Sequence, residues 1–146
     1  MPRRPYKKTV TKPDPLYNSY EVEKLVNYVM IDGKKSIAYD IVYGAFERLK
    51  KEKLNPSEVL NKVIENTAPT HEVKSKRVGG ASYLVPSETR SQRKLYLSFS
   101  AIITAAKARP NKQYHTFEEK LFAELMDAYQ KQGGAVEKKT QAEKLA

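Results

Sequence analysis

The chain has 146 residues, no cysteine and a formal net charge of +10, from 27 Lys and Arg residues against 17 Asp and Glu residues. This composition excludes disulfides, thiolate metal sites and a cysteine nucleophile, and apolar runs of only a few residues argue against a membrane-spanning helix. A basic chain of this length predicts one domain whose partners are polyanions, with RNA and DNA ahead of an anionic membrane surface.

Residues 1–15 are predicted to form a basic extended arm. Its cations are Arg3, Arg4, Lys7, Lys8 and Lys12. Four prolines in the same segment oppose regular structure. A solvated tail and an arm that becomes ordered on a phosphate backbone both fit this composition. The basic start is not followed by the apolar stretch of a secretory signal.

Residues 16–146 are predicted to form a single, mainly α domain of five to six helices, because apolar residues recur at helical spacing. Asn18 with Glu21 has capping-box spacing and is expected to open the first helix. The apolar face of that helix continues to Met30. A stop signal at Asp32, which precedes a glycine, is expected to end it.

A second helix is expected from about Lys35 to Lys51, with Ile37 on its apolar stripe. Asn55 followed by Pro56 is a start signal for a third helix, because the first residue can cap and proline suits the first helical position. This third helix is expected to stop before Pro69.

A protruding β-hairpin is predicted at about 71–86, between the third and fourth helices. Two alternating runs meet there at Gly79 and Gly80, and a Gly-Gly pair adopts positive φ without steric cost, as a two-residue turn requires. Pro86 is expected to close the hairpin. The side chains suited to a nucleic acid are Lys74, Lys76 and Arg77 on the first run and Tyr83 on the second.

The remaining helices follow the hairpin. A fourth is expected to open near Ser91 and to end at Pro110. Thr116, three residues before a glutamate, has capping-box spacing and starts a fifth, which the pair Gly133-Gly134 closes. A short cationic sixth helix is expected from Lys138 to Ala146.

The sequence contains no enzyme motif. A dinucleotide-binding glycine pattern, a phosphate loop, a nucleophile elbow and a zinc-protease motif are all missing. The two histidines, His71 and His115, have no ligand-like spacing to carboxylates. We therefore expect no enzyme, no cofactor and no metal site.

Cations concentrate between residues 74 and 94, where six of them face a single acid. Such clusters neutralise phosphates and give a salt-dependent, largely sequence-independent affinity. Backbone recognition of structured RNA, architectural binding of DNA by the hairpin and a regulatory RNA-binding enzyme are the alternatives. The Gly-Gly tip offers no apolar wedge for DNA, and no catalytic constellation supports the enzyme.

Three tyrosines lie outside the predicted helices and are the candidates for stacking on bases or riboses. They are Tyr6, Tyr17 and Tyr83. For Tyr83, packing against a cross-strand neighbour within the hairpin is the alternative interpretation.

Five matches in order and spacing carry a resemblance to a known family. They are Met1–Arg4, Pro13–Pro15, Asp32–Ser36 with Ile41–Tyr43, Glu72–Pro86 and Gly133–Lys139. Over nearly all of its length the chain resembles the seventh small-subunit ribosomal protein in its bacterial or organellar form. The hairpin segment matches almost residue for residue. The segment Ser87–Lys94 departs from the usual family pattern, which has an arginine-tryptophan pair in that vicinity.

The resemblance implies a structural constituent of the small ribosomal subunit that binds the 3′ major domain of its rRNA early and nucleates assembly of the subunit head. It implies neighbouring head and platform proteins as partners, with exit-site tRNA and mRNA near the hairpin. Neither a membrane nor a homo-oligomer is expected, and the implied location is a cytoplasmic or organellar ribosome.

Two groups of site residues are implied by position in the family. The implied rRNA contacts are Arg3, Arg4, Lys7, Lys8, Lys34, Lys35, Lys74, Lys76, Arg93 and Lys94. The implied exit-site hairpin tip is Arg77, Val78, Gly79, Gly80, Ala81, Ser82 and Tyr83.

Overall fold

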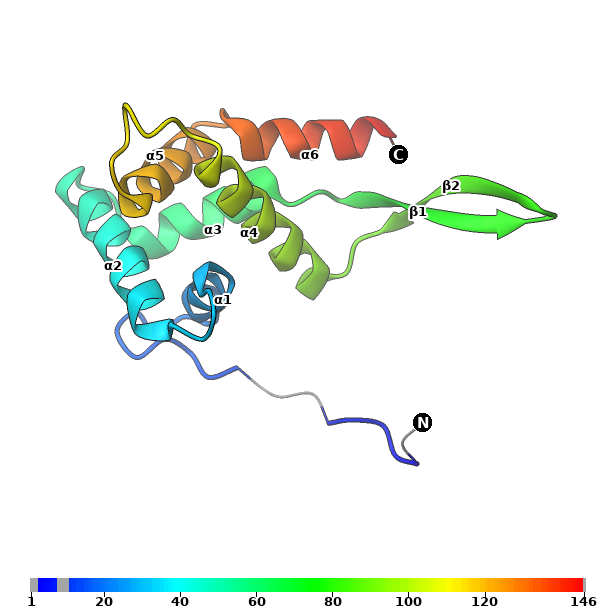
Figure 1. Ribbon diagram of the computed structural model, residues 1–146, viewed down its shortest axis with the longest axis horizontal. Helices are drawn as coiled ribbons and strands as arrows, with labels where there is room; N and C mark the ends of the chain where they lie inside the picture. The colour runs from blue at the N-terminus through cyan, green and yellow to red at the C-terminus, as the bar shows by residue number, and fades with distance from the viewer. Residues whose placement is uncertain (1–2, 8–10, 146) are drawn as a thin grey trace.

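The computed structural model describes residues 3–7 and 11–145, and this part of the chain contains six helices and one two-stranded antiparallel sheet (Figure 1). The elements in chain order are α1 (Tyr20–Val29), α2 (Lys35–Lys51), α3 (Pro56–Thr67), β1 (His71–Val78), β2 (Ala81–Glu88), α4 (Ser91–Lys107), α5 (Phe117–Tyr129) and α6 (Gly134–Leu145). The predicted mainly α fold, with a hairpin between the third and fourth helices, is confirmed. In the described part, every helix is too short or too polar to cross a membrane.

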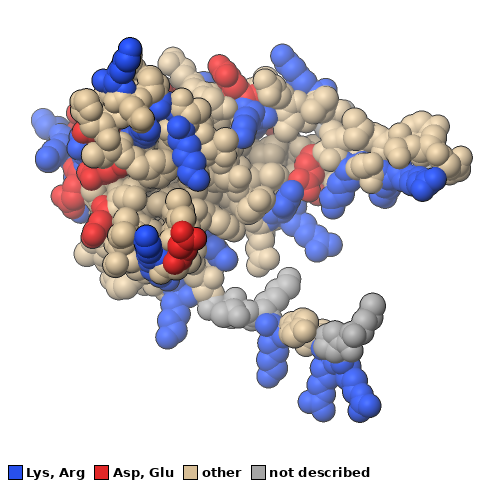
Figure 2. All heavy atoms as spheres, in the orientation of Figure 1, with Lys and Arg blue, Asp and Glu red and all other residues tan. Residues whose placement is uncertain are grey.

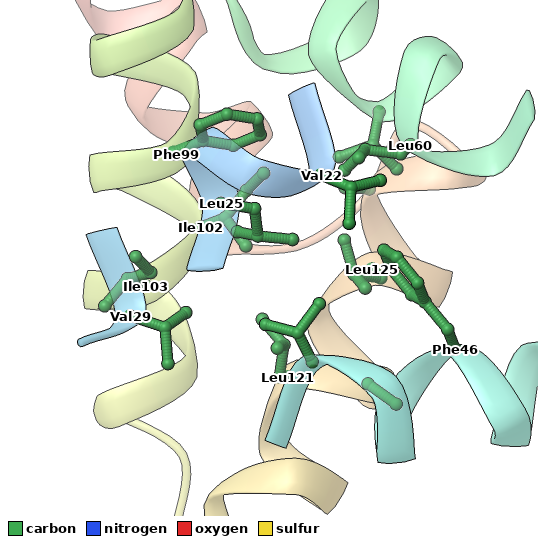
Figure 3. Close-up of a cluster of buried hydrophobic side chains, with 14 of the residues drawn as sticks. Val22, Leu25, Val29, Phe46, Leu60, Phe99, Ile102, Ile103, Leu121 and Leu125 are labelled. Atoms are coloured by element: carbon green, nitrogen blue, oxygen red, sulfur yellow. The ribbon is translucent and has the colours of Figure 1, made fainter. Parts of the chain in front are cut away.

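The hydrophobic core lies where the apolar faces of α1 to α5 meet (Figure 3). Phe46 of α2, Phe99 of α4 and Leu125 of α5 are fully buried there. Helix α5 packs against α2, α3 and α4 and so joins the early and late parts of the chain. Each large apolar side chain buried in this way stabilises the fold by roughly 1.5–3 kcal/mol. The helical body therefore holds most of the free energy of folding.

Local capping signals explain where α3 and α5 begin. The Asn55 side chain accepts a hydrogen bond from the backbone N–H of Ser57 at 3.1 Å. The Thr116 hydroxyl accepts one from the N–H of Glu119 at 3.3 Å, and the Glu119 carboxylate accepts one from the N–H of His115 at 3.0 Å. Both predicted starts are confirmed, since each capping side chain satisfies a backbone donor that the helix leaves free.

The predicted cap of the first helix is wrong. Helix α1 has Ser19 at its N-cap, and Asn18 has a φ of 50°, which is incompatible with the extended conformation of an N-cap residue. The reason is a turn closed by Asp14, whose carbonyl accepts a hydrogen bond from the N–H of Asn18 at 2.7 Å. The helix also ends earlier than predicted, at Val29, and Met30 follows it with an extended ψ of 134°.

Helix α2 has the predicted bounds, but one residue of its expected apolar stripe is misplaced. Ile37 is 53% exposed, whereas Ala38, Val42 and Phe46 are buried. The buried face of α2, which packs against α1, α3 and α5, is therefore rotated away from Ile37.

The end of the hairpin and the start of α6 also differ from the prediction. Pro86 does not close the hairpin, since it lies opposite Val73 and the strand continues to Glu88. Each strand of a two-stranded sheet has a free edge, where a residue without an N–H is tolerated. Helix α6 begins at Gly134, not at Lys138. The predicted end at Ala146 lies outside the described residues.

The hairpin projects away from the helical body along the long axis of the molecule (Figure 1). Within the described residues, the hairpin contacts the helical body at its base: α6 packs against β1, and the Thr70 hydroxyl donates a hydrogen bond to the Glu143 carboxylate at 3.3 Å. The outer part of the hairpin thus has two faces open to solvent.

Candidate nucleic-acid interface

The register of the hairpin decides which side chains share a face. The strands pair continuously from His71 opposite Glu88 to Val78 opposite Ala81, and Gly79 and Gly80 make the turn with φ values of 59° and 84°. Directly opposite residues in an antiparallel pair point to the same face, and alternate residues point to opposite faces. The pairing alone therefore assigns each residue of the hairpin to one of its two faces.

We call one side of the hairpin the lysine face. It carries Lys74 opposite Val85 and Lys76 opposite Tyr83. We call the other side the leucine face. It carries Val73 opposite Pro86, Ser75 opposite Leu84 and Arg77 opposite Ser82.

The cations of β1 are available to a ligand. Lys74, Lys76 and Arg77 are exposed, and within the described residues none of them forms an ion pair. Tyr83 is 58% exposed. Figure 2 shows Lys and Arg side chains gathered along one side of the projecting hairpin, whereas carboxylates are interspersed with the cations of the helical body. Beyond its base, the projection thus presents cations without interspersed carboxylates.

At the base of the hairpin, Arg93 of α4 is already engaged. Its Nε lies 3.3 Å from a carboxylate oxygen of Glu72, and its guanidinium lies 4.9 Å from the ring centroid of Tyr96. An exposed ion pair of this kind contributes about 0–1 kcal/mol, so a phosphate can replace the carboxylate at little cost. The next residue, Lys94, is half-buried and forms no ion pair among the described residues.

The two lysines between α1 and α2 differ in their surroundings. Lys34 is exposed, but the Nζ of Lys35 lies 2.6 Å from a carboxylate oxygen of Glu23, whose side chain is almost buried on α1. The Tyr39 hydroxyl donates a hydrogen bond to the other oxygen of Glu23 at 2.7 Å. The hydrogen bond to Glu23 raises the pKa of Lys35. Lys34 is therefore free for a phosphate, whereas Lys35 stabilises the packing of α1 against α2.

The arm is joined to the helical body through Asp14, which is buried. Its carboxylate accepts hydrogen bonds from the N–H groups of Leu16 at 3.0 Å and Tyr17 at 2.8 Å, and from the Tyr43 hydroxyl at 2.6 Å. Burial, together with the hydrogen bond to Asp14, raises the pKa of Tyr43. These contacts determine where the basic segment leaves the body.

The described cations of the arm are exposed. Arg3, Arg4, Lys7 and Lys12 lie on segments without helix or strand, before the start of α1. Lys8, also predicted to contact rRNA, lies outside the described residues.

One cation that the sequence analysis did not single out has a structural role. Arg109, just after α4, lies 2.8 Å from a carboxylate oxygen of Glu124 and also pairs with Asp127. It donates a further hydrogen bond to the Tyr114 hydroxyl at 3.1 Å. The other oxygen of Glu124 accepts a hydrogen bond from the N–H of Ala135 at 3.2 Å. Arg109 and Glu124 together therefore connect the end of α4, α5 and the start of α6. The two carboxylate partners of Arg109 lie 15 and 18 residues away in sequence, and no local signal marks them.

Two of the three stacking candidates differ sharply from the third. Tyr17 is part of the core edge, with its ring centroid 5.1 Å from that of Phe46 in an edge-on arrangement. Tyr6 and Tyr83 are exposed and form no aromatic pair among the described residues. In that same part of the chain, no group of three or more His, Asp or Glu side chains is arranged to hold a metal ion.

The family comparison covers the whole chain. The family model described as "Ribosomal protein S7p/S5e" matches residues 1–146. The chain belongs to this family. The resemblance carried by the five sequence segments is thereby confirmed.

Several bacterial relatives are similar to this chain over most of their length. "Small ribosomal subunit protein uS7" of Caldicellulosiruptor bescii is 47% identical over 148 residues, covering 100% of this chain and 93% of the relative. The protein of the same name from Thermodesulfovibrio yellowstonii is 45% identical, with the same coverage. That of Pelagibacter ubique is 44% identical over 140 residues, covering 95% of this chain and 88% of the relative.

Proposed function

We propose that this chain is a structural constituent of the small ribosomal subunit that binds the 3′ major domain of small-subunit rRNA. Two findings support it: membership of the S7p/S5e family, and relatives that are named small ribosomal subunit proteins. The structural observation that carries the rRNA assignment is the presence of exposed, unpaired Lys74 and Lys76 on a hairpin that projects from a helical body.

The mechanism is electrostatic contact with a folded RNA backbone from positions that the helical body fixes. The body does not change shape to place the cations, because its core is tightly packed and the hairpin and arm start from defined points on it. Lysine and arginine contacts to phosphate position a protein on RNA and make its affinity salt-dependent. The proposed rRNA contacts are Arg3, Arg4, Lys7, Lys8, Lys34, Lys35, Lys74, Lys76, Arg93 and Lys94.

Lys35 and Arg93 contribute differently from the others. Each already has a carboxylate partner, Glu23 for Lys35 and Glu72 for Arg93. Arg93 is itself exposed and can exchange the half-buried carboxylate of Glu72 for a phosphate, whereas Lys35 would leave a nearly buried acid unpaired. Among the ten residues, we therefore expect Lys35 to contribute least to rRNA affinity.

Early rRNA binding would nucleate assembly of the subunit head, with head and platform proteins as neighbours and no catalytic role. The hairpin tip, Arg77 to Tyr83, would lie near the exit-site tRNA and the mRNA path. The protein would act as one copy in each ribosome of the cytoplasm, with residues 1–15 as a basic arm and residues 16–146 as a single domain.

The test is binding of the purified protein to a transcript of the 3′ major domain and to duplex DNA of equal length, across a salt series. We expect saturable binding to the rRNA that persists at salt concentrations that abolish DNA binding. Equal affinities with equal salt slopes would instead indicate general binding to polyanions and would contradict an rRNA site.

A second experiment separates the tip from the main rRNA site. Shortening the hairpin by removing Val78–Ser82 should leave rRNA binding largely intact, because the tip is the outer end of the projection, away from the helical body (Figure 1). Subunits assembled with the shortened protein should retain exit-site tRNA less well. Loss of rRNA affinity in this variant would place the tip within the primary site.

A further inference from the structure

We propose that the hairpin binds unpaired RNA through its lysine face alone, with the Tyr83 ring stacked on a base and Lys74 and Lys76 on the adjoining phosphates. This inference rests on the proposed function, because it takes RNA as the ligand of the hairpin. Beyond that function, it specifies which face of the hairpin binds, which contacts that face makes, and that the bound RNA is single-stranded.

The two faces of the hairpin differ in chemistry although both are open to solvent. The lysine face combines two free ammonium groups with an exposed phenol ring. The leucine face presents an exposed apolar group, Leu84, which is 67% exposed, together with a proline. Its cation, Arg77, lies near the tip. Proteins that bind single-stranded nucleic acids combine aromatic rings with cations, because the ring stacks on a base while the cation contacts the phosphate backbone.

Tyr83 is available for stacking in a way that most helical tyrosines are not. The rings of Tyr28, Tyr39, Tyr43 and Tyr96 each lie within 6 Å of another aromatic ring, centroid to centroid. Within the described residues Tyr83 has no such neighbour and no cation over its ring. Its cross-strand neighbour is a lysine, so packing within the hairpin does not cover it.

The spacing of Lys74, Lys76 and Tyr83 on the lysine face suits a few consecutive nucleotides of single-stranded RNA. Lys76 lies directly opposite Tyr83, so their Cβ atoms are about 5 Å apart, within reach of the base and phosphate of neighbouring nucleotides. Lys74 lies two residues further along the same face, about 7 Å away. Long flexible stems let both ammonium groups follow successive phosphates of an extended strand.

The same geometry disfavours a duplex. In A-form RNA the base faces are covered by stacking, and the deep, narrow major groove excludes side chains. An exposed tyrosine ring gains stacking energy only from a base that is already unpaired or splayed out. The ligand of the lysine face is therefore single-stranded.

The chain contains no tryptophan, so a single indole can report on each face. Tyr83→Trp places it on the lysine face and Leu84→Trp on the leucine face, one residue away. Both proteins are titrated with a short single-stranded RNA and with a duplex RNA of equal length. We expect the single strand to quench the fluorescence of Tyr83→Trp and to leave that of Leu84→Trp unchanged, with little quenching by the duplex. Equal quenching of both variants, or stronger quenching by the duplex, would overturn the proposal.

Affinity provides a second measurement. Tyr83→Ala should weaken binding of the single strand by roughly 5- to 100-fold, the range found for the loss of one stacked base. Leu84→Ala should leave that affinity unchanged. Both residues are exposed, so neither variant should lower the thermal midpoint, and an equal loss of affinity in both would contradict the face assignment.

Failure of this inference is distinguishable from failure of the proposed function. Binding to the 3′ major-domain transcript is measured for the same two tryptophan variants. Retained transcript binding without selective quenching at position 83 would overturn the face assignment alone. Selective quenching without specific transcript binding would support the lysine face and contradict the rRNA assignment.

Discussion

The helical body and the hairpin differ in how their cations are partnered, because within the described residues the body pairs some of its cations with acids and the outer hairpin pairs none. In the body, Arg109 pairs with Glu124 and Asp127, and Arg48 pairs with Glu118. On the hairpin, the cations beyond its base have no carboxylate partner among the described residues. The role of a cation thus depends on whether the fold brings an acid to it. Paired cations stabilise the packing of helices, and unpaired ones remain for an external anion.

The two regions also differ in what they contribute to folding. The body buries large apolar side chains from five helices, whereas both strands of the hairpin are mostly exposed. An isolated two-stranded hairpin is at best marginally stable in water, so this one depends on its base, where α6 packs against β1. Changes on the lysine face should therefore weaken binding of single-stranded RNA without lowering the free energy of unfolding, whereas changes in the core should lower the free energy of unfolding.

A cavity in the core should have the largest effect on the free energy of unfolding. Phe46→Ala should lower the free energy of unfolding by about 3–5 kcal/mol, because it removes a fully buried ring packed among α2 and its neighbours. Tyr83→Ala on the hairpin should leave it unchanged. Urea unfolding followed by circular dichroism measures both. A comparable loss in the Tyr83 variant would show that the hairpin is part of the cooperative core.

A second prediction compares two ion pairs within the body. Arg109→Met leaves the almost buried Glu124 carboxylate without its cation, and we expect a loss of about 3 kcal/mol. Arg48→Met breaks a more exposed pair with Glu118 and should cost less than about 1 kcal/mol. Denaturant midpoints of the two variants test this ordering. Similar small losses would mean that water hydrates Glu124 readily.

Local signals predicted much of the fold. The caps at Asn55 and Thr116 depend on residues close in sequence, and both were found where the pattern placed them. The start of α6 could not be predicted in this way. Lys131 and Gly133, with φ values of 59° and 95°, make the turn before α6, and the N–H of Ala135 donates a hydrogen bond to the carboxylate of Glu124 from another helix.

The candidate site shows the same limit. Lys34 and Lys35 are identical in type and adjacent in sequence, yet only Lys35 meets Glu23. The acid lies on the buried side of α1, and its distance from Lys35 depends on how α1 and α2 pack. Composition located the basic segments, but only tertiary structure separates cations that are free from cations that are already paired.

The cations at and beyond the base of the hairpin should differ from those of the body in their effect on RNA affinity. Lys74→Ala should lower the slope of log affinity for rRNA against log salt by roughly 1 unit, the loss of one phosphate contact. Arg93→Ala should lower it by a similar amount. Since Arg93 must first leave Glu72, the variant Glu72→Ala should raise affinity where Lys74→Ala reduces it. Unchanged slopes in both cation variants would remove these residues from the proposed contacts.

The smallest effect concerns the hydrogen bond between Tyr43 and Asp14, where the arm joins the body. Tyr43→Phe should cost about 1 kcal/mol at neutral pH, because Asp14 keeps its two backbone donors. Tyr83→Phe is the matched control on the hairpin, where the hydroxyl has no hydrogen bond among the described residues. It should have no effect on the free energy of unfolding.

The pH dependence of the free energy of unfolding shows how much the Tyr43 hydroxyl contributes to stability. Burial and the bond to Asp14 raise the pKa of Tyr43 in the folded chain, whereas a free tyrosine has a pKa of about 10. Below pH 10 the hydroxyl is protonated in both states, so its stabilisation is fully present. As the pH rises further, the unfolded chain ionises first and the free energy of unfolding falls. Tyr39, whose pKa is raised by its bond to Glu23, adds to the same fall. Denaturant unfolding between about pH 8 and 12 should therefore show a shallower decline in Tyr43→Phe than in the parent, and parallel curves would mean that the Tyr43 hydroxyl ionises equally easily in both states.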